Sequence, residues 1–186
     1  NTLAAITTCI LLGLSREDVI KRVQNLKSVS GRLDKVENDK NVNIIVDYAH
    51  TPDALLNILK SARLFTKNRI ILVFGCGGNR DKAKRPIMGK IAQQNADISI
   101  ITSDNPRFEK EMDIIEDILC GIDKTLDNYF VVQDREDSIK KAIELYEVGD
   151  LIIIAGKGHE NYQIEGDKKY FFDDKLIAKK ILDEKE

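Results

Sequence analysis

Short, continuous runs of apolar and β-branched residues alternate along this chain with longer segments of helical pattern. A strand buried on both faces of a sheet is apolar throughout, and strands that alternate with helices build a parallel sheet from βαβ units. The sequence therefore predicts an α/β fold, a Rossmann-like, mostly parallel sheet with helices on both faces. The expected strands are 44–46, 70–74, 98–101, 129–132 and 151–154, and the expected helices are 52–65, about 85–95, about 111–122, 136–147 and about 174–184.

Two further helices are expected before this alternation begins. Residues 2–13 have helical composition that ends at Gly13, and Ser15 is a typical N-cap for a second helix running to about Leu26. Residues 28–31 have the pattern of a linker, so we expect a domain boundary there, between 1–30 and 31–186. Because the chain enters an apolar stretch directly after Asn1, we expect it to be a piece of a longer protein.

Composition excludes several classes of function. The 29 Lys+Arg and 31 Asp+Glu residues give a formal charge of −2, which argues against binding nucleic acid through a basic field. No apolar run approaches the roughly 20 residues of a membrane span. The three Cys residues are widely spaced, so neither a disulfide framework nor a zinc site is expected, and reduced thiols in a cytoplasmic protein are the better interpretation.

Unusual polar loops follow four of the predicted strands. They cover residues 47–53, 75–81, 103–107 and 156–160, and they contain both His residues of the chain. Ligands of open parallel sheets bind beyond the carboxyl ends of the strands. Glycines, carboxylates and guanidinium groups that collect at this one edge therefore predict a site for a polar ligand.

Each loop also has a simpler interpretation when it is taken alone. The glycines of 75–78 suit a tight turn, Asp47 suits a helix cap, and His50 and His159 suit a solvated surface. Residues 75–80 are not a dinucleotide fingerprint because Arg80 stands at the third glycine position, which disfavours a dehydrogenase. Residues 156–158 lack the remaining residues of a nucleotide P-loop, and no His–carboxylate relay is legible beside Cys76. The coincidence of four such loops favours a functional edge.

At these loops the sequence resembles the MurE family, the UDP-N-acetylmuramoyl-tripeptide synthetases of peptidoglycan synthesis. The matching stretches are 47–55, 74–89, 104–107 and 156–160, in the family's order. The resemblance implies that 1–30 is the C-terminal end of the central ATP-binding domain and that 31–186 is the C-terminal domain. It implies an ATP-dependent acid–amino-acid ligase that uses Mg²⁺, ATP/ADP, UDP-MurNAc-L-Ala-D-Glu and meso-2,6-diaminopimelate. The phosphate-binding loop and the UDP-sugar domain lie outside this chain, which alone is expected to be inactive.

The resemblance also implies roles for particular residues. It places Asn1 near the adenine, Arg32 near the nucleotide after domain closure about the linker, and Asp47 on the ribose hydroxyls. It implies no catalytic or metal-binding residue in this part of the protein. The residues that match the family's amino-acid pocket are Arg80, Asp104, Asn105, Arg107, Gly156 and Glu160.

Charge complementarity gives this implied pocket a specificity. Meso-diaminopimelate differs from lysine by a distal carboxylate, and the planar guanidinium of Arg107 can bind it through two hydrogen bonds. Glu160, Asp104 and the Gly156 carbonyl can receive the distal ammonium, and Arg80 the other carboxylate. Lysine would leave Arg107 without an anion, and relatives that add lysine usually lack Arg at this place.

Three alternatives remain open from the sequence. Lanthionine has the same distal charges as diaminopimelate. A related Mur or folylpolyglutamate-type ligase would share the fold with another acceptor, such as lysine. A non-catalytic, Rossmann-like binding module would lack an amino-acid or nucleotide site at the strand ends.

Overall fold

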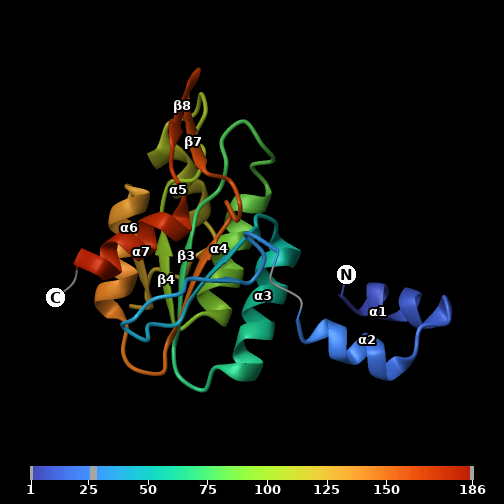
Figure 1. Ribbon diagram of the computed structural model, residues 1–186. Coiled ribbons are helices and arrows are strands. Elements are labelled where there is room, and N and C mark those ends of the chain that lie inside the picture. Colours follow the sequence, from blue (N-terminus) through green and yellow to red (C-terminus); the bar gives the residue numbers. More distant parts are fainter. Residues whose placement is uncertain (1, 26–28, 185–186) are drawn as a thin grey trace.

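A six-stranded sheet organises the computed structural model, which describes residues 2–25 and 29–184 (Figure 1). The strands are β1 (Asp34–Lys35), β2 (Ile44–Asp47), β3 (Ile70–Phe74), β4 (Ile98–Ile101), β5 (Tyr129–Val131) and β6 (Leu151–Ala155), with a separate hairpin of β7 (Tyr162–Glu165) and β8 (Lys168–Phe171). The helices are α1 (Thr2–Leu11), α2 (Arg16–Val23), α3 (Pro52–Phe65), α4 (Lys84–Asn95), α5 (Glu111–Leu119), α6 (Arg135–Leu145) and α7 (Asp174–Glu184).

The strand order is β1-β2-β6-β3-β4-β5, and every pairing in this sheet is parallel except that of β1 with β2. β6 lies between β2 and β3, so the carboxyl ends of these three strands and of β4 are neighbours along one edge. The predicted α/β, mostly parallel sheet is thereby confirmed.

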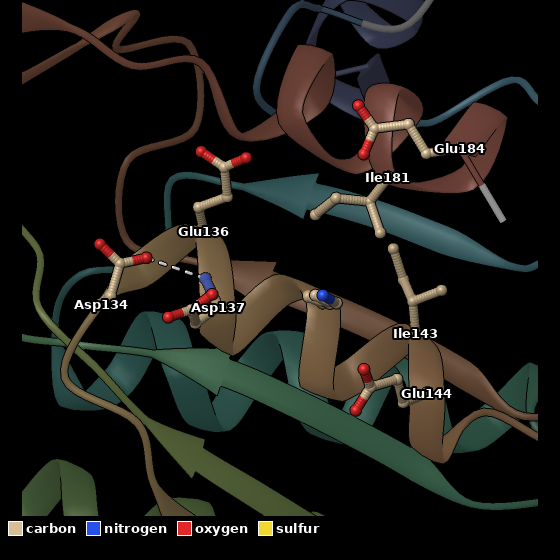
Figure 2. Close-up of a pocket in the computed structure, with 8 residues that line it drawn as sticks. Asp134, Glu136, Asp137, Ile143, Glu144, Ile181 and Glu184 are labelled. Carbon is tan, nitrogen blue, oxygen red and sulfur yellow. Dashed lines mark hydrogen bonds between the residues drawn. The ribbon is translucent and has the colours of Figure 1, made fainter.

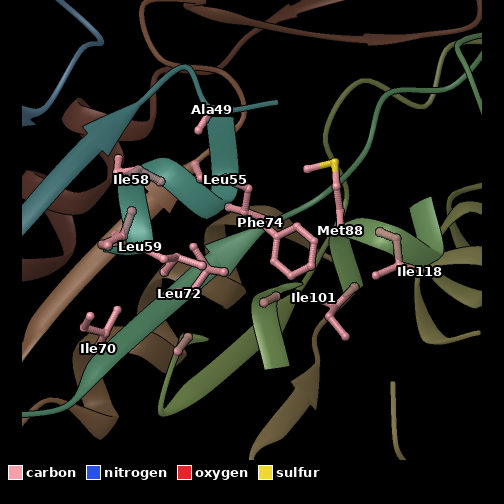
Figure 3. Packing of buried hydrophobic residues seen from close by; sticks show 14 of the residues in the cluster. Ala49, Leu55, Ile58, Leu59, Ile70, Leu72, Phe74, Met88, Ile101 and Ile118 are labelled. Carbon is pink, nitrogen blue, oxygen red and sulfur yellow. The ribbon is translucent and has the colours of Figure 1, made fainter. Parts of the chain in front are cut away.

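Two apolar layers cover the sheet. One core lies between the sheet and α3, α4 and α5, where Phe74 and Met88 are fully buried and lie side by side in Figure 3. The other lies between the sheet and α6 and α7, and includes Ile139, Ala142 and Ala178. Successive residues of β3 and β6 face opposite cores, which explains why these strands are apolar at every position.

The strand and helix predictions are closely matched, and the differences lie mainly in the connections. The N-cap expected at Ser15 is present, and Thr51 caps α3 in the same way; each side chain accepts a hydrogen bond from a backbone N–H three residues later. The predicted helix 111–122 was too long, because regular helix ends at Leu119. Neither the short antiparallel β1 nor the β7–β8 hairpin was among the strands expected from the sequence.

α1 and α2 lie apart from the sheet in Figure 1. Among their described residues only Val19 is buried, whereas Leu3, Leu11 and Leu12 are about four-fifths exposed, at 79%, 82% and 79%. Within the described part of the chain, no helix is long and apolar enough to cross a lipid bilayer. The assignment of residues 1–30 to a separate domain remains a prediction.

A buried ion pair joins the N-terminal ends of α6 and α7 to the carboxyl ends of β4 and β6. Arg135 donates two 2.8 Å hydrogen bonds to Asp174, and both side chains are completely buried. The same guanidinium donates to the carbonyls of Ser103 and Ala155, at 3.2 and 3.1 Å. Ser103 lies just after β4, and Ala155 is the last residue of β6. Arg135 therefore fixes the spacing between the ends of these two strands.

Replacing Arg135 with Met should lower the free energy of unfolding by about 3–5 kcal/mol, because Asp174 would remain buried without its cation. Chemical denaturation measures this effect. The exposed Lys180–Glu136 pair provides a matched control, and Lys180→Met should leave the free energy of unfolding close to that of the wild type. Equal losses in the two variants would contradict the importance of the buried pair.

Candidate functional site

A cavity of about 550 Å³ lies at the carboxyl ends of β2, β3, β4 and β6. All four polar loops singled out in the sequence contribute to its walls. The six residues predicted for an amino-acid pocket line it together: Arg80, Asp104, Asn105, Arg107, Gly156 and Glu160. Tyr48, His50, Cys76 and Lys84 are among the other lining residues.

Two of these loops touch through their backbones. The N–H of Gly78 donates to the carbonyl of Asn105 at 2.9 Å. A Cβ on Gly78 would lie 1.9 Å from the Pro106 carbonyl oxygen, and a Cβ on Gly75 would lie 2.2 Å from that of Thr102. The glycines are therefore required by the close approach of the two loops, which holds 75–80 against 103–107.

Arg107 is held from both sides of its loop. Its backbone is left-handed, with φ of 53°, and exchanges hydrogen bonds with the hairpin through the carbonyl of Ile164 and the N–H of Gly166. Its Nη1 atom donates to the carbonyl of Gly78 at 2.9 Å. Among the described residues, no hydrogen bond engages Nε or Nη2 of Arg107, so one edge of the fork is free for an anion.

Acidic groups line the same cavity as this cation. Asp104 is 8% exposed, and no side chain or backbone group in the described ranges donates a hydrogen bond to its carboxylate. Glu160 is half-buried and accepts a 2.9 Å hydrogen bond from Asn105 Nδ2. Gly156 has φ of 115°, and a Cβ there would lie 2.8 Å from Asp104 Oδ2, so glycine at this position leaves room for the carboxylate. The two carboxylates can receive an ammonium group.

Two further residues that line the cavity, Arg80 and Cys76, differ in whether their side chains are available to a ligand. Arg80 is exposed and forms no hydrogen bond or ion pair with the described residues, so its cation is available to a ligand. Cys76 is buried against Met88, and burial raises the pKa of its thiol to about 12. The thiol is therefore protonated near neutral pH, which agrees with the expectation that it is not a nucleophile.

Arg85 is a positioning residue that the sequence analysis missed. Its side chain is fully buried at the start of α4 and donates to Glu109 and Asp117, at 2.9 and 2.8 Å, and to the Gly77 carbonyl at 3.3 Å. Glu109 also accepts from the backbone N–H of Asn79. The pair thus ties the glycine loop to the segment that follows Arg107, and no sequence pattern separates this buried Arg from solvated neighbours.

Arg32 and Asp47, two of the residues predicted to bind the nucleotide, contact residues next to the cavity but are not among its described lining. Arg32 is exposed, and its guanidinium carbon lies 4.8 Å from the centre of the Tyr48 ring. Asp47 is 8% exposed and accepts backbone hydrogen bonds from Leu33 and Ala49, at 2.8 and 2.9 Å. In this structure Asp47 thus anchors the turn that carries Arg32. Asn1 lies outside the described residues, and all three roles remain predictions.

The described residues contain no cluster of three or more His, Cys, Asp or Glu side chains arranged to hold a metal ion. A second cavity, of about 560 Å³, lies between α6 and α7 (Figure 2). It is lined mainly by carboxylates, but Asp134 caps α6 through the N–H of Asp137, and Glu136 pairs with Lys180. These acidic groups have structural partners or face solvent, so this cavity is a weaker candidate than the edge of the sheet.

The Glu109 carboxylate predicts a loss of stability in acid. The hydrogen bond from Arg85 is the main cause that lowers the pKa of Glu109 from 4.5 to about 2. A depressed carboxyl pKa stabilises the folded state above pH 4.5, and that stability is lost as the pH falls toward 2.

Between pH 5 and pH 2 the wild type should therefore lose about 1–2 kcal/mol more of unfolding free energy than Glu109→Gln, after allowance for solvent screening. Urea denaturation across this range measures the difference. Parallel pH profiles of the two proteins would show that the ion pair does not stabilise the loops.

Comparisons with known proteins agree with this geometry. A family model described as "Mur ligase, glutamate ligase domain" matches residues 31–158. The protein of Clostridioides difficile named UDP-N-acetylmuramoyl-L-alanyl-D-glutamate–2,6-diaminopimelate ligase is 53% identical over 182 residues, covering 98% of this chain and 38% of that relative. Its namesake in Fusobacterium nucleatum is 49% identical over 183 residues, again 98% of this chain and 38% of the relative.

Solved structures of ligases are also similar to this chain. A ligase structure of the same name superimposes with a TM-score of 0.79 at 38% identity, covering 98% of this chain and 37% of that one. The UDP-N-acetylmuramate–alanine ligase of Thermotoga maritima has a TM-score of 0.62 at 21% identity, with coverage of 98% and 36%, which supports the fold alone. The chain spans less than two fifths of the length of these relatives. It belongs to the Mur ligase family and corresponds to a C-terminal portion of its diaminopimelate ligases.

Proposed function

We propose that this chain is the amino-acid-binding part of a longer, ATP-dependent ligase that joins meso-diaminopimelate to UDP-MurNAc-L-Ala-D-Glu in peptidoglycan synthesis. The observation that carries the proposal is that Arg107, Asp104 and Glu160 line one cavity. The ligand is a zwitterion at each end, so both signs of charge are needed within the length of a small molecule.

The Gly78 carbonyl accepts from Nη1 of Arg107, whereas Nε and Nη2 donate to no acceptor in the described chain. These two atoms can therefore bind the distal carboxylate through parallel hydrogen bonds. Glu160 and Asp104 provide the charge for the distal ammonium. The exposed Arg80 is suited to the other carboxylate. Lysine lacks the distal carboxylate, so it would leave Arg107 without an ionic partner, and we infer discrimination against it.

ATP would supply the phosphoryl group that activates the acceptor carboxylate. The exposed Arg32 fits a role beside an anionic nucleotide, since within the described chain the Tyr48 ring is the one partner of its guanidinium. The partly engaged Asp47 can still accept from a ribose hydroxyl, and a divalent cation, Mg²⁺ in our proposal, would be held mainly by residues outside this chain. We infer a cytoplasmic enzyme, because a nucleotide-dependent reaction and free cysteines suit that compartment.

The exposed apolar residues of α1 and α2 support the inference that the rest of the longer protein covers them. The linker near residues 28–31 would then act as a hinge that brings Arg32 to the nucleotide. In the longer protein, small-angle scattering should report a more compact particle when ATP and the UDP-linked substrate are added together. Identical profiles with and without these ligands would contradict closure.

Arg107→Ala in the longer protein should reduce kcat/KM for diaminopimelate by about 30-fold to 1,000-fold, because a desolvated charge pair is lost. It should also reduce the preference for diaminopimelate over lysine. A coupled assay of phosphate release with diaminopimelate, lysine and lanthionine measures both effects.

Arg63→Ala is the matched control, since this exposed arginine pairs with Asp97 at the opposite edge of the sheet and lines no part of the candidate cavity in the described chain. Its kcat/KM should stay near the wild-type value. Undiminished use of diaminopimelate by Arg107→Ala would refute the assignment, and activity with another acceptor alone would favour a related ligase.

A further inference from the structure

A buried lysine lies directly behind the candidate cavity and has no part in the recognition described above. Lys157 follows Gly156 at the end of β6, and its side chain is completely buried. Its Nζ atom donates a 3.2 Å hydrogen bond to Asn105 Oδ1 and another hydrogen bond to the Tyr162 carbonyl. A buried cation costs free energy unless its hydrogen bonds are satisfied, so its contacts matter for the site.

The hydrogen bond from Lys157 is one of two that occupy Oδ1, the acceptor atom of the Asn105 side chain. Oδ1 of Asn105 accepts from Lys157 and also from the backbone N–H of Ile164, at 2.9 Å. A side-chain carbonyl oxygen has two lone pairs, and both are now engaged. If the amide were turned over, its NH₂ group would meet two donors, so this orientation alone satisfies the cluster.

The orientation of the amide determines which hydrogen-bonding group Asn105 presents to the cavity. Its Nδ2 atom donates to Glu160 Oε2 at 2.9 Å, and the second hydrogen of the same NH₂ group is not engaged by any described residue. Asn105 is thus a donor on the cavity side, suited to a ligand carboxylate and unable to accept from a ligand ammonium. Glu160, which receives the ammonium, is held in place by the same amide.

We propose that Lys157 is a positioning residue that fixes the Asn105 amide as a donor toward Glu160 and the bound amino acid. The identity of that amino acid rests on the proposed function. Burial lowers the pKa of Lys157, and the Asp104 carboxylate opposes that shift. Through its place in the chain and its two hydrogen bonds, Lys157 links three elements of the site: the end of β6, the loop after β4, and the β7–β8 hairpin.

A double-mutant cycle in the longer protein tests the proposal. Lys157→Met should raise the KM for diaminopimelate at least 10-fold, with a smaller change in kcat and an unchanged KM for ATP. In an Asn105→Ala background the same replacement should change that KM by less than threefold, because Lys157 acts through Asn105. Lys169→Met is the matched control, since exposed Lys169 stacks on Tyr162 from another position and should leave all constants unchanged.

Should Lys157→Met fail to fold, Asn105→Asp gives a second test. The new carboxylate can accept hydrogen bonds from Lys157 and the Ile164 N–H as the amide oxygen does, yet it places an acceptor beside Glu160 where Asn105 places a donor. Its KM for diaminopimelate should rise at least as much as that of Asn105→Ala.

Two results would overturn the positioning role: a full Lys157→Met effect that persists in the Asn105→Ala background, or an Asn105→Asp variant with wild-type KM. If the wild-type longer protein does not use diaminopimelate, the proposed function fails instead. The cycle is then measured with the amino acid that it does use.

Discussion

The two loops that follow β3 and β4 lie so close together that no side chain fits between them. Gly78 touches Pro106 through backbone atoms, and the Arg107 guanidinium binds the Gly78 carbonyl. This contact converts two adjacent strand ends of a parallel sheet into one wall of a cavity. The positions of Arg80 and Arg107 relative to the carboxylates that line the same cavity depend on it.

Buried charges hold this arrangement from behind. Arg85 pairs with Glu109 beneath the glycine loop, Arg135 pairs with Asp174 beneath the ends of β4 and β6, and Lys157 binds Asn105. Each cation also donates to at least one backbone carbonyl of the strand ends or their loops. Because leaving one partner of such a cluster unpaired is costly, the functional edge has few alternative arrangements. Rigidity of this kind allows small differences in ligand charge to be discriminated.

Much of this architecture could be predicted from the sequence, for reasons that are visible in particular residues. Residues 70–74 are apolar at each position because both faces of β3 are covered, and Thr51 with Pro52 marks the start of α3. The six residues expected in the pocket meet because their loops follow neighbouring parallel strands. The β7–β8 hairpin was missed because its polar, largely exposed strands lack the apolar run that marks the other strands. Arg85, Arg135 and Lys157 were missed as buried groups, since burial of a cation depends on distant partners that leave no local pattern.

We propose that the Arg107 guanidinium binds the distal carboxylate of the ligand through two parallel hydrogen bonds, and that this contact determines the specificity of the site. The measurement that tests it most directly is a crystal structure of the longer protein with bound meso-diaminopimelate. We expect the distal carboxylate to lie within hydrogen-bonding distance of Arg107 and the distal ammonium to lie beside Glu160 and Asp104. A ligand bound in the cavity while the Arg107 side chain turns toward solvent would contradict it.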